Sequence, residues 1–365
     1  MRKWNFNPGP AVLPLPVLET LQKNTVEYGS LGMSLLEMSH RSKDFEAILN
    51  GCKARFHEVF AVPDTHEVLF VGGGASLQFS MVPMNFMKDG AADYLVTGTW
   101  AKKALKEAKI WSAFSGGKPA AAASTESENF TRLPKPEEWK FNPGARYVHL
   151  TSNNTVYGTQ WHAFPQTPAG VPVVADMSSD ILSRAVDVSK FHLIYAGAQK
   201  NLGPAGVTVL ILRKDWLAEC PDNLPTMMNY KTHAENNSLY NTPPVFAIYA
   251  VMLVLDWVKD KGGIEAVEQE NNKKAELLYG VMDANPDYYK GTVTDPASRS
   301  YMNVTFRLPS EELEAQFIKD AAASHFHGLK GHRSVGGIRV SMYNALELYG
   351  IERLCEFMLA FMKSH

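Results

Sequence analysis

Short apolar segments alternate with amphipathic, helix-like segments through the first two thirds of the chain. Each apolar segment has the length of a strand and is bounded by Gly, Asn, Asp or Ser. The segments are VLFV (68–71), YLV (94–96), YVHL (147–150), VPVVA (171–175), LIYA (193–196) and VTVLILR (207–213). This alternation predicts an α/β domain around a largely parallel sheet.

The pattern changes after DWVKDKGG at 256–263. A long amphipathic stretch is followed by a strand-like MNVTF (302–306), a helical SEELEAQFIKDAAASH (310–325), a strand-like IRVSM (338–342) and a final helix. These elements indicate a second, smaller α/β unit. We expect an N-terminal segment at 1–15 that packs on the small domain, a large domain at 16–262 and a small C-terminal domain at 263–365.

Two other stretches have simpler interpretations. The apolar run at 245–255, VFAIYAVMLVL, is too short to span a bilayer and predicts a buried helix. The small-residue stretch SGGKPAAAAST at 115–125 predicts a loop.

Composition narrows the class of protein. The chain has 365 residues, 45% hydrophobic and 20% charged, with a net charge of -2 and no run of five like charges, so neither nucleic-acid nor membrane-surface binding has support. Cys52, Cys220 and Cys355 are far apart, which argues against a disulfide framework and a zinc site. Because prolines interrupt the N-terminal stretch before any apolar run, we do not expect it to act as a signal peptide. We expect a cytoplasmic protein without a bound metal.

Glycine or polar residues follow the predicted strands. The segments after the first five strands are GGGASLQF, TGTW, TSNNTVYG, Asp176 and GAQK. Ligands of open α/β sheets bind beyond the carboxyl ends of the strands, so we expect a cofactor site there. GGGAS suits a phosphate, because free N–H groups at a helix start and the Ser76 hydroxyl can hold an anion. It is also consistent with a turn that merely packs tightly.

Lys200 lies among small residues in IYAGAQKNLGPAG at 194–206. A lysine amine has a pKa of about 10.4, but an enclosed apolar setting favours the neutral, nucleophilic form, which can form a Schiff base with an aldehyde cofactor. Asp176 could then keep a pyridine nitrogen protonated, and Trp100 could stack on a planar ring. Taken singly, these residues are more often a surface lysine, a helix cap and a half-buried aromatic.

Together, these segments resemble the phosphoserine aminotransferase family. The matching segments are IYAGAQKNLGPAG, GGGAS, TGTW, SNNT, VVADMSSDILSR, YNTPP, KGHRSVGGIRVSMYNA, NFNPGPAVLP and MSHRS, so the resemblance covers essentially the whole chain. It implies a class-V, fold-type I enzyme dependent on pyridoxal 5'-phosphate (PLP), homodimeric with one PLP per subunit. The implied reaction moves an amino group between L-glutamate and 3-phosphohydroxypyruvate, giving 2-oxoglutarate and O-phospho-L-serine.

The resemblance also implies roles for individual residues. Lys200 would carry the Schiff base, Asp176 would pair with the pyridine nitrogen, and Trp100 would stack on the ring. The remaining cofactor contacts would be Thr155 to the ring hydroxyl and, to the phosphate, Ala75, Ser76 and Gln199, with Asn241 and Thr242 from the other subunit. Some members have an arginine in the Gly-rich loop where this chain has ASL.

Two arginine-containing segments match the substrate-binding pattern of the family. A dicarboxylate and a phosphorylated keto acid must use one pocket in turn, and the arginine fork binds carboxylate and phosphate alike. Arg339 matches the α-carboxylate clamp, and the distal anion site consists of His40, Arg41, His332 and Arg333. Without the family pattern, the two His-Arg pairs could be solvated surface residues.

Other functions remain open. A cysteine desulfurase would need a reactive cysteine on a mobile loop, and none of the three cysteines lies in a recognisable loop of that kind. A non-catalytic anion sensor would need neither Lys200 nor Asp176. Within the family, the residues do not separate 3-phosphohydroxypyruvate from the keto acid that yields 4-phosphohydroxy-L-threonine.

Overall fold

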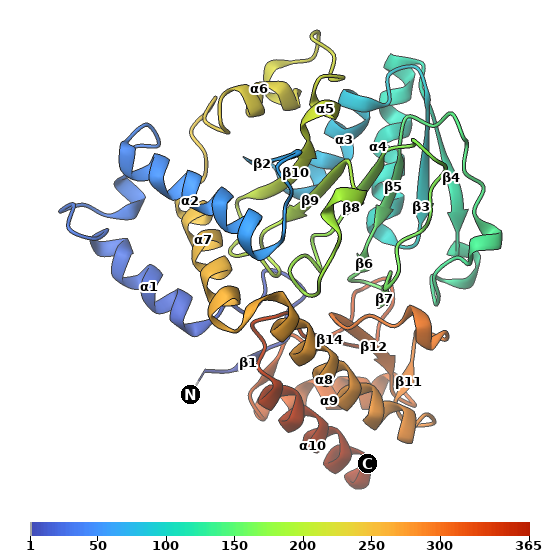
Figure 1. Cartoon of the computed structure of the whole chain (residues 1–365). Helices are drawn as coiled ribbons and strands as arrows, with labels where there is room; N and C mark the ends of the chain where they lie inside the picture. The colour runs from blue at the N-terminus through green and yellow to red at the C-terminus, as the bar shows by residue number, and fades with distance from the viewer. Residues whose placement is uncertain (1) are drawn as a thin grey trace.

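A computed structural model describes residues 2–365, and its largest element is a seven-stranded sheet (Figure 1). From one edge to the other, the strands are β2 (His66–Val71), β10 (Thr208–Arg213), β9 (Leu193–Gly197), β8 (Val173–Asp176), β5 (Val148–Thr151), β3 (Ala91–Val96) and β4 (Lys118–Ser124). β10 is antiparallel to both its neighbours, whereas the other pairs are parallel. The six predicted strands and the largely parallel sheet are confirmed.

The prediction of a loop at 115–125 is wrong, because residues 118–124 form the edge strand β4. This strand pairs with β3 along its length, with a shift in register after Tyr94. Alanine has little preference for strands, and most of β4 is not buried, so neither composition nor alternation marks it. Backbone hydrogen bonds to β3 hold β4 in the sheet.

Helices cover both faces of the sheet (Figure 1). On one face, α2 (Lys43–Val59) and α7 (Val245–Asp260) pack on strand residues such as Phe70, and α1 (Leu15–Val26) packs on α7. On the other face, α3 (Gly74–Phe86) and α4 (Thr99–Ser115) pack on residues such as Leu69, together with side chains of the short helices α5 (Lys214–Leu217) and α6 (Tyr230–Glu235). The predicted buried helix at 245–255 is confirmed as part of α7.

The C-terminal elements form a second layered unit beside the main sheet (Figure 1). They are α8 (Gly263–Ala284), β11 (Lys290–Gly291), β12 (Asn303–Arg307), α9 (Glu311–Ala323), β13 (Phe326–His327), β14 (Ile338–Ser341) and α10 (Leu348–Ser364). Strands β11, β12 and β14 form an antiparallel sheet with its own hydrophobic core. The short N-terminal strand β1 (Trp4–Asn5) pairs with β13. The division into an N-terminal segment (1–15), a large domain (16–262) and a small domain (263–365) stays a proposal. Met1 lies outside the described residues.

Buried polar groups join the two units. The hairpin of β6 (Asn153–Asn154) and β7 (Thr159–Gln160) contacts the C-terminal unit. The side-chain amide of Asn153 donates to Asn303 Oδ1 at 2.8 Å, and the backbone N–H of Tyr301 donates to Gln160 Oε1 at 2.9 Å. Hydrogen bonds are directional, so these contacts set the orientation of one unit on the other. Across residues 2–365, no helix combines the length and the apolar character that a membrane crossing requires.

Gly158 in the β6–β7 hairpin offers a test of this junction. Its φ is 82°, and a Cβ there would lie 2.7 Å from Thr305 Oγ1 and 3.0 Å from the Asn303 carbonyl oxygen. Gly158→Ala should therefore lower the free energy of unfolding by about 1–3 kcal/mol, measured by urea denaturation. Gly170→Ala is the matched control, because Gly170 has a φ of 76° but open space around it. Equal losses in the two variants would show that the contact with β12 contributes nothing.

Candidate active site

The carboxyl ends of the parallel strands meet at one edge of the main sheet. Thr151 at the end of β5 is the register partner of Asp176 at the end of β8, and Asp176 is in turn the partner of Tyr195 in β9. A cavity of about 130 Å³ lies at this edge. Its walls come from the segments after β5, β8 and β9, the first turn of α3 and the first turn of α4.

Most of the predicted cofactor residues lie together at this cavity. The residues that line it include Ala75, Ser76, Trp100, Asp176, Gln199 and Lys200. Thr155 lies beside them, because Lys200 Nζ donates a hydrogen bond to Thr155 Oγ1 at 2.7 Å. Segments far apart in the chain are thus brought together as the strand-end rule predicts.

Lys200 is held in the connection between β9 and β10. The N–H of Ala198 donates to the Val207 carbonyl at 3.0 Å, and the N–H of Gly203 donates to the Ala198 carbonyl at 2.8 Å, which closes this connection on itself. Burial is the main reason that the pKa of Lys200 falls to about 8; the negative charge of Asp176 opposes the fall, and the positive charge of Arg339 adds to it. The neutral form of the amine is therefore far more populated than in an ordinary lysine, at roughly a tenth of the molecules at pH 7.

Asp176 is the last residue of β8 and is 4% exposed. Burial raises the pKa of Asp176, whereas a hydrogen bond from the Ser178 N–H at 3.0 Å and the charge of Lys200 oppose the rise. A buried carboxylate with so few donors is best stabilised by a cationic group in the cavity.

The Gly-rich turn between β2 and α3 presents backbone donors to the cavity. Gly73 and Gly74 have φ values of 83° and 67°, a conformation that glycine adopts without strain. α3 begins at Gly74, so the amides of Ala75 and Ser76 belong to its first turn, where N–H groups have no partner within the helix. Such a helix start binds a phosphate through its free N–H groups and dipole.

Three buried groups at the site that can donate have no hydrogen-bond partner within residues 2–365: the indole N–H of Trp100, the Nε–H of Arg339 and the hydroxyl of Thr151. Arg339 is 6% exposed, and its Nη1 makes only a long hydrogen bond, 3.4 Å, to the Thr155 carbonyl. A buried guanidinium with so little compensation requires an anion. The unpaired donors, the free α3 amides and the amine of Lys200 together fit a phosphorylated aldehyde cofactor and an anionic substrate.

Further positive charge surrounds Arg339. His332 and Arg333 lie in the segment between β13 and β14. Burial lowers the pKa of His332, and the positive charges of Arg339, Arg333 and Lys103 lower it further, so these cations are near neighbours. The predicted anion-binding residues of the C-terminal unit therefore gather on one side of the site.

Eight predicted residues are absent from the lining of the cavity. Thr155 and Arg339 are nevertheless linked to Lys200 through hydrogen bonds, and His332 and Arg333 lie near Arg339. No such link is present for the other four, His40, Arg41, Asn241 and Thr242, within residues 2–365. Arg41, Asn241 and Thr242 are exposed, and His40 is half-buried. The family resemblance implies that Asn241 and Thr242 reach the cavity from the other subunit. For His40 and Arg41 it does not imply a contribution from the other subunit.

Sequence reasoning missed a second buried carboxylate, Asp180. It accepts hydrogen bonds from Ser152 Oγ and from Gln160 Nε2 at 3.2 Å, and Arg184 Nη2 lies 3.8 Å from its Oδ2. Its charge also raises the pKa of Lys200. The only signal was a second aspartate four residues after Asp176. Six lining residues were also missed: Gly74, Phe79, Thr151, Asn153, Ser178 and Ser179.

The three cysteines do not suit desulfurase chemistry. Cys52, Cys220 and Cys355 are free and buried. Burial raises the pKa of the Cys220 and Cys355 thiols to about 12 and that of Cys52 further, so little reactive thiolate is present at neutral pH. In the described part of the chain, no group of three or more His, Cys, Asp or Glu residues could hold a metal ion.

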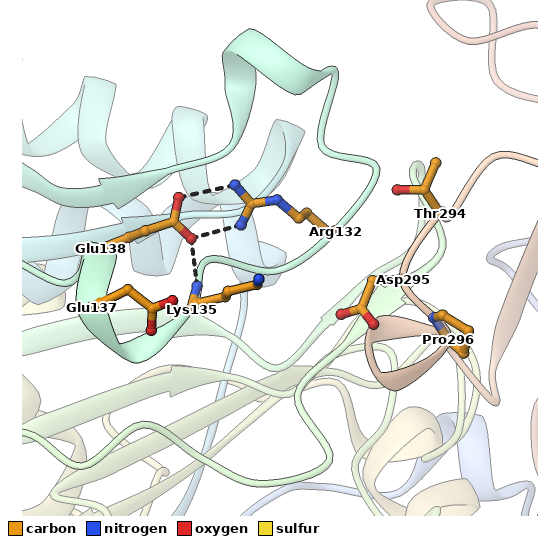
Figure 2. Close-up of a pocket in the computed structure, with 7 residues that line it drawn as sticks. All are labelled: Arg132, Lys135, Glu137, Glu138, Thr294, Asp295 and Pro296. Carbon is orange, nitrogen blue, oxygen red and sulfur yellow. Dashed lines mark hydrogen bonds and ion pairs between the residues drawn. The ribbon is translucent and has the colours of Figure 1, made fainter.

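A second pocket, of about 580 Å³, lies away from the strand ends between the 132–138 segment and residues 294–296 (Figure 2). Figure 2 shows that one of its carboxylates, Glu138, accepts hydrogen bonds from the Arg132 guanidinium and from the Lys135 backbone N–H. It contains none of the predicted site residues.

Comparisons with known proteins agree with this geometry. Residues 3–354 match the family described as aminotransferase class-V. A phosphoserine aminotransferase of Desulfosudis oleivorans is 54% identical over 366 residues, an alignment that covers 100% of this chain and 99% of the relative.

Two solved structures are similar along their whole length. A phosphoserine aminotransferase of Bacillus circulans subsp. alkalophilus superposes with a TM-score of 0.96 at 53% identity, covering 100% of this chain and 99% of the other. A PLP-bound phosphoserine aminotransferase of Trichomonas vaginalis has a TM-score of 0.93 at 37% identity, covering 98% and 100%. The chain belongs to the class-V aminotransferase family and, within it, to the phosphoserine aminotransferases.

Proposed function

We propose that this chain is a PLP-dependent aminotransferase that moves an amino group between L-glutamate and 3-phosphohydroxypyruvate, giving 2-oxoglutarate and O-phospho-L-serine. The observation that carries the proposal is the arrangement around Lys200. Its amine, with a pKa lowered to about 8, lies near a buried carboxylate, Asp176, and near a buried guanidinium, Arg339, whose Nε–H has no partner within residues 2–365. An amine to bond an aldehyde, a carboxylate and an anion clamp are the parts that this reaction requires.

The residues at the strand ends fit PLP. Lys200 would bond its aldehyde, Asp176 would pair with its ring nitrogen, Trp100 would stack on its ring, and Thr155 would hydrogen-bond its hydroxyl. The phosphate would be held by the amides of Ala75 and Ser76 and by Gln199. When bound, PLP supplies a ring that accepts the electron pair of the Cα–H bond and carries the amino group between the two substrates.

The chain itself supplies the proton transfers and the binding of anions. The neutral amine of Lys200 can take a proton from the substrate Cα as a general base and return it as a general acid. The Thr155 hydroxyl, which accepts the present hydrogen bond from Lys200, keeps that amine oriented in the cavity. A buried carboxylate without a partner is costly, so Asp176 would favour a protonated, positively charged nitrogen on the cofactor ring that faces it.

Arg339 would bind the α-carboxylate that both substrates share. The distal group differs, since glutamate ends in a carboxylate and 3-phosphohydroxypyruvate in a phosphate. A cluster of Arg and His donors accommodates both. We assign His332 and Arg333 to this distal site, together with His40 and Arg41.

We also propose that the chain acts as a homodimer whose active sites are shared. Apolar side chains are exposed around the residues that a single chain leaves outside the cavity: Val26 is 79% and Leu36 62% exposed in the segment before His40, and Tyr240 is exposed directly before Asn241. A second subunit that covers these apolar residues would bring in Asn241 and Thr242 from its own chain. We further propose a cytoplasmic location, in keeping with three unpaired cysteines.

The first prediction concerns Lys200. Purified wild-type protein should show a visible absorption band of the bound cofactor that changes when glutamate is added. Lys200→Ala should lose this band and lower transamination about 10²–10⁴-fold, because the tether and the general base are removed together. Lys190→Ala, at an exposed position, is the control. Full transamination by Lys200→Ala would refute the proposal.

The second prediction concerns the distal anion site. Arg41→Ala should weaken binding of the phosphorylated substrate by about 1.5–3 kcal/mol, the scale of a hydrogen bond to a charged group. Steady-state kinetics should show this as a KM at least about tenfold higher. Arg353→Ala on α10 serves as control, since that arginine is exposed and pairs with Glu356. An unchanged KM in Arg41→Ala would remove Arg41 from the site.

The third prediction tests the shared site by complementation. A Lys200→Ala subunit retains Asn241 and Thr242, whereas an Asn241→Ala/Thr242→Ala subunit retains Lys200. A mixed dimer therefore contains one complete site, and subunit exchange should raise activity above that of the two variants assayed separately. Activity equal to their sum, with exchange verified by mass spectrometry, would contradict a shared site.

A further inference from the structure

Lys274 of α8 is a buried lysine that does not touch the cavity. It is 0% exposed and forms no ion pair within residues 2–365. Its Nζ donates instead to three backbone carbonyls, those of Leu346 at 3.0 Å, Tyr343 at 3.1 Å and Met342 at 3.4 Å. In its protonated form the amine has three N–H donors, so each then has an acceptor of its own.

The three carbonyls belong to one turn, residues 342–346, between β14 and α10. This turn contacts the residue next to Lys200: the backbone N–H of Asn344 donates to Asn201 Oδ1 at 3.0 Å. Asn201 Nδ2 in turn donates to the Ile181 carbonyl at 3.1 Å. Through Asn201, the turn is thereby connected to the segment after β9, which carries Lys200, and to the segment after β8, which follows Asp176.

Asn271, one helical turn before Lys274 on α8, strengthens the same connection. Its Nδ2 donates to Asn344 Oδ1 at 2.9 Å and to the Ser183 carbonyl at 3.0 Å. Asn344 Nδ2 also donates to the Leu182 carbonyl at 2.9 Å. α8 therefore contacts both the 342–346 turn and the segment that follows Asp176.

Burying an ammonium is expensive, and burial lowers the pKa of Lys274 to about 7. An apolar side chain of similar volume would fill the same space at lower cost, but it could not gather three carbonyls at one point. The benefit of the lysine is therefore geometric: it fixes the conformation of a turn that contacts Asn201.

We propose that Lys274 is a positioning residue, which holds the 342–346 turn against Asn201 and so fixes Lys200 relative to Asp176. The inference rests on the proposed role of Lys200. We expect a smaller effect on the α-carboxylate clamp. Tyr343 of the turn lies near Arg339, but the pairing of β14 with β12, in which Arg339 is the register partner of Thr305, also holds this arginine.

The test compares Lys274→Met with Lys273→Met in the holoenzyme, since Lys273 is the exposed neighbour on the same helix. In Lys274→Met, the pH at which the visible band of the bound cofactor titrates should shift by about half a unit or more, because the surroundings of Lys200 change. We expect kcat to fall about tenfold, the KM values to stay within about twofold, and Lys273→Met to change none of these.

Asn201→Ala removes the acceptor at the other end of the connection. If the effect of Lys274 passes through Asn201, the double variant should shift the band no further than the larger single variant does. Additive shifts would overturn the proposal. So would a Lys274→Met protein that loses thermal stability while its band titrates as in the wild type.

If Lys274→Met does not fold, Lys274→Gln takes its place, and Asn201→Ala must still shift the band for the proposal to stand. The outcome is separable from the proposed function. A wild-type band that Lys200→Ala abolishes, combined with an unshifted band in the Lys274 variants, would refute the positioning role alone.

Discussion

The burial of several ionisable groups at one edge of the sheet is the physical constraint on which the rest of the site depends. Lys200, Asp176, Asp180 and Arg339 lie close enough for their charges to shift the pKa of Lys200. Asp180 has Arg184 as a cationic neighbour. The two carboxylates favour the charged form of Lys200, whereas the positive charge of Arg339 disfavours it. The hydroxyls and amides around them, such as Thr155 and Ser152, supply the remaining hydrogen bonds.

The same constraint explains why the two units meet through polar contacts. An apolar interface would hold the C-terminal unit firmly but would tolerate sliding, whereas hydrogen bonds between buried amides have defined directions. Asn153 to Asn303 and Tyr301 to Gln160 are bonds of this kind. They place Arg339, which the C-terminal unit carries, at a defined position relative to Lys200, which the main sheet carries.

Sequence reasoning located the part of the site that follows from strand ends. Buried parallel strands leave a clear apolar signal. Asp176 ends such a strand, and Lys200 and Trp100 come within four residues after one. β4 was missed because an alanine-rich edge strand is held by its backbone and has no apolar pattern. Asp180 was missed because its role comes from Ser152 and Gln160, which are distant in the chain. Arg339 was identified through the family resemblance, since no local pattern links β14 to the main sheet.

The antiparallel direction of β10 limits how Lys200 can work. The chain enters the cavity at the end of β9 and returns into the sheet at the start of β10, and both ends of this connection are anchored by strand pairing. Strand pairing therefore fixes the backbone position of Lys200. The amine moves between its resting contact and a reacting carbon by rotation about the four side-chain bonds, over about a few ångströms. Its direction is thus set by the two paired strands and not by a moving loop.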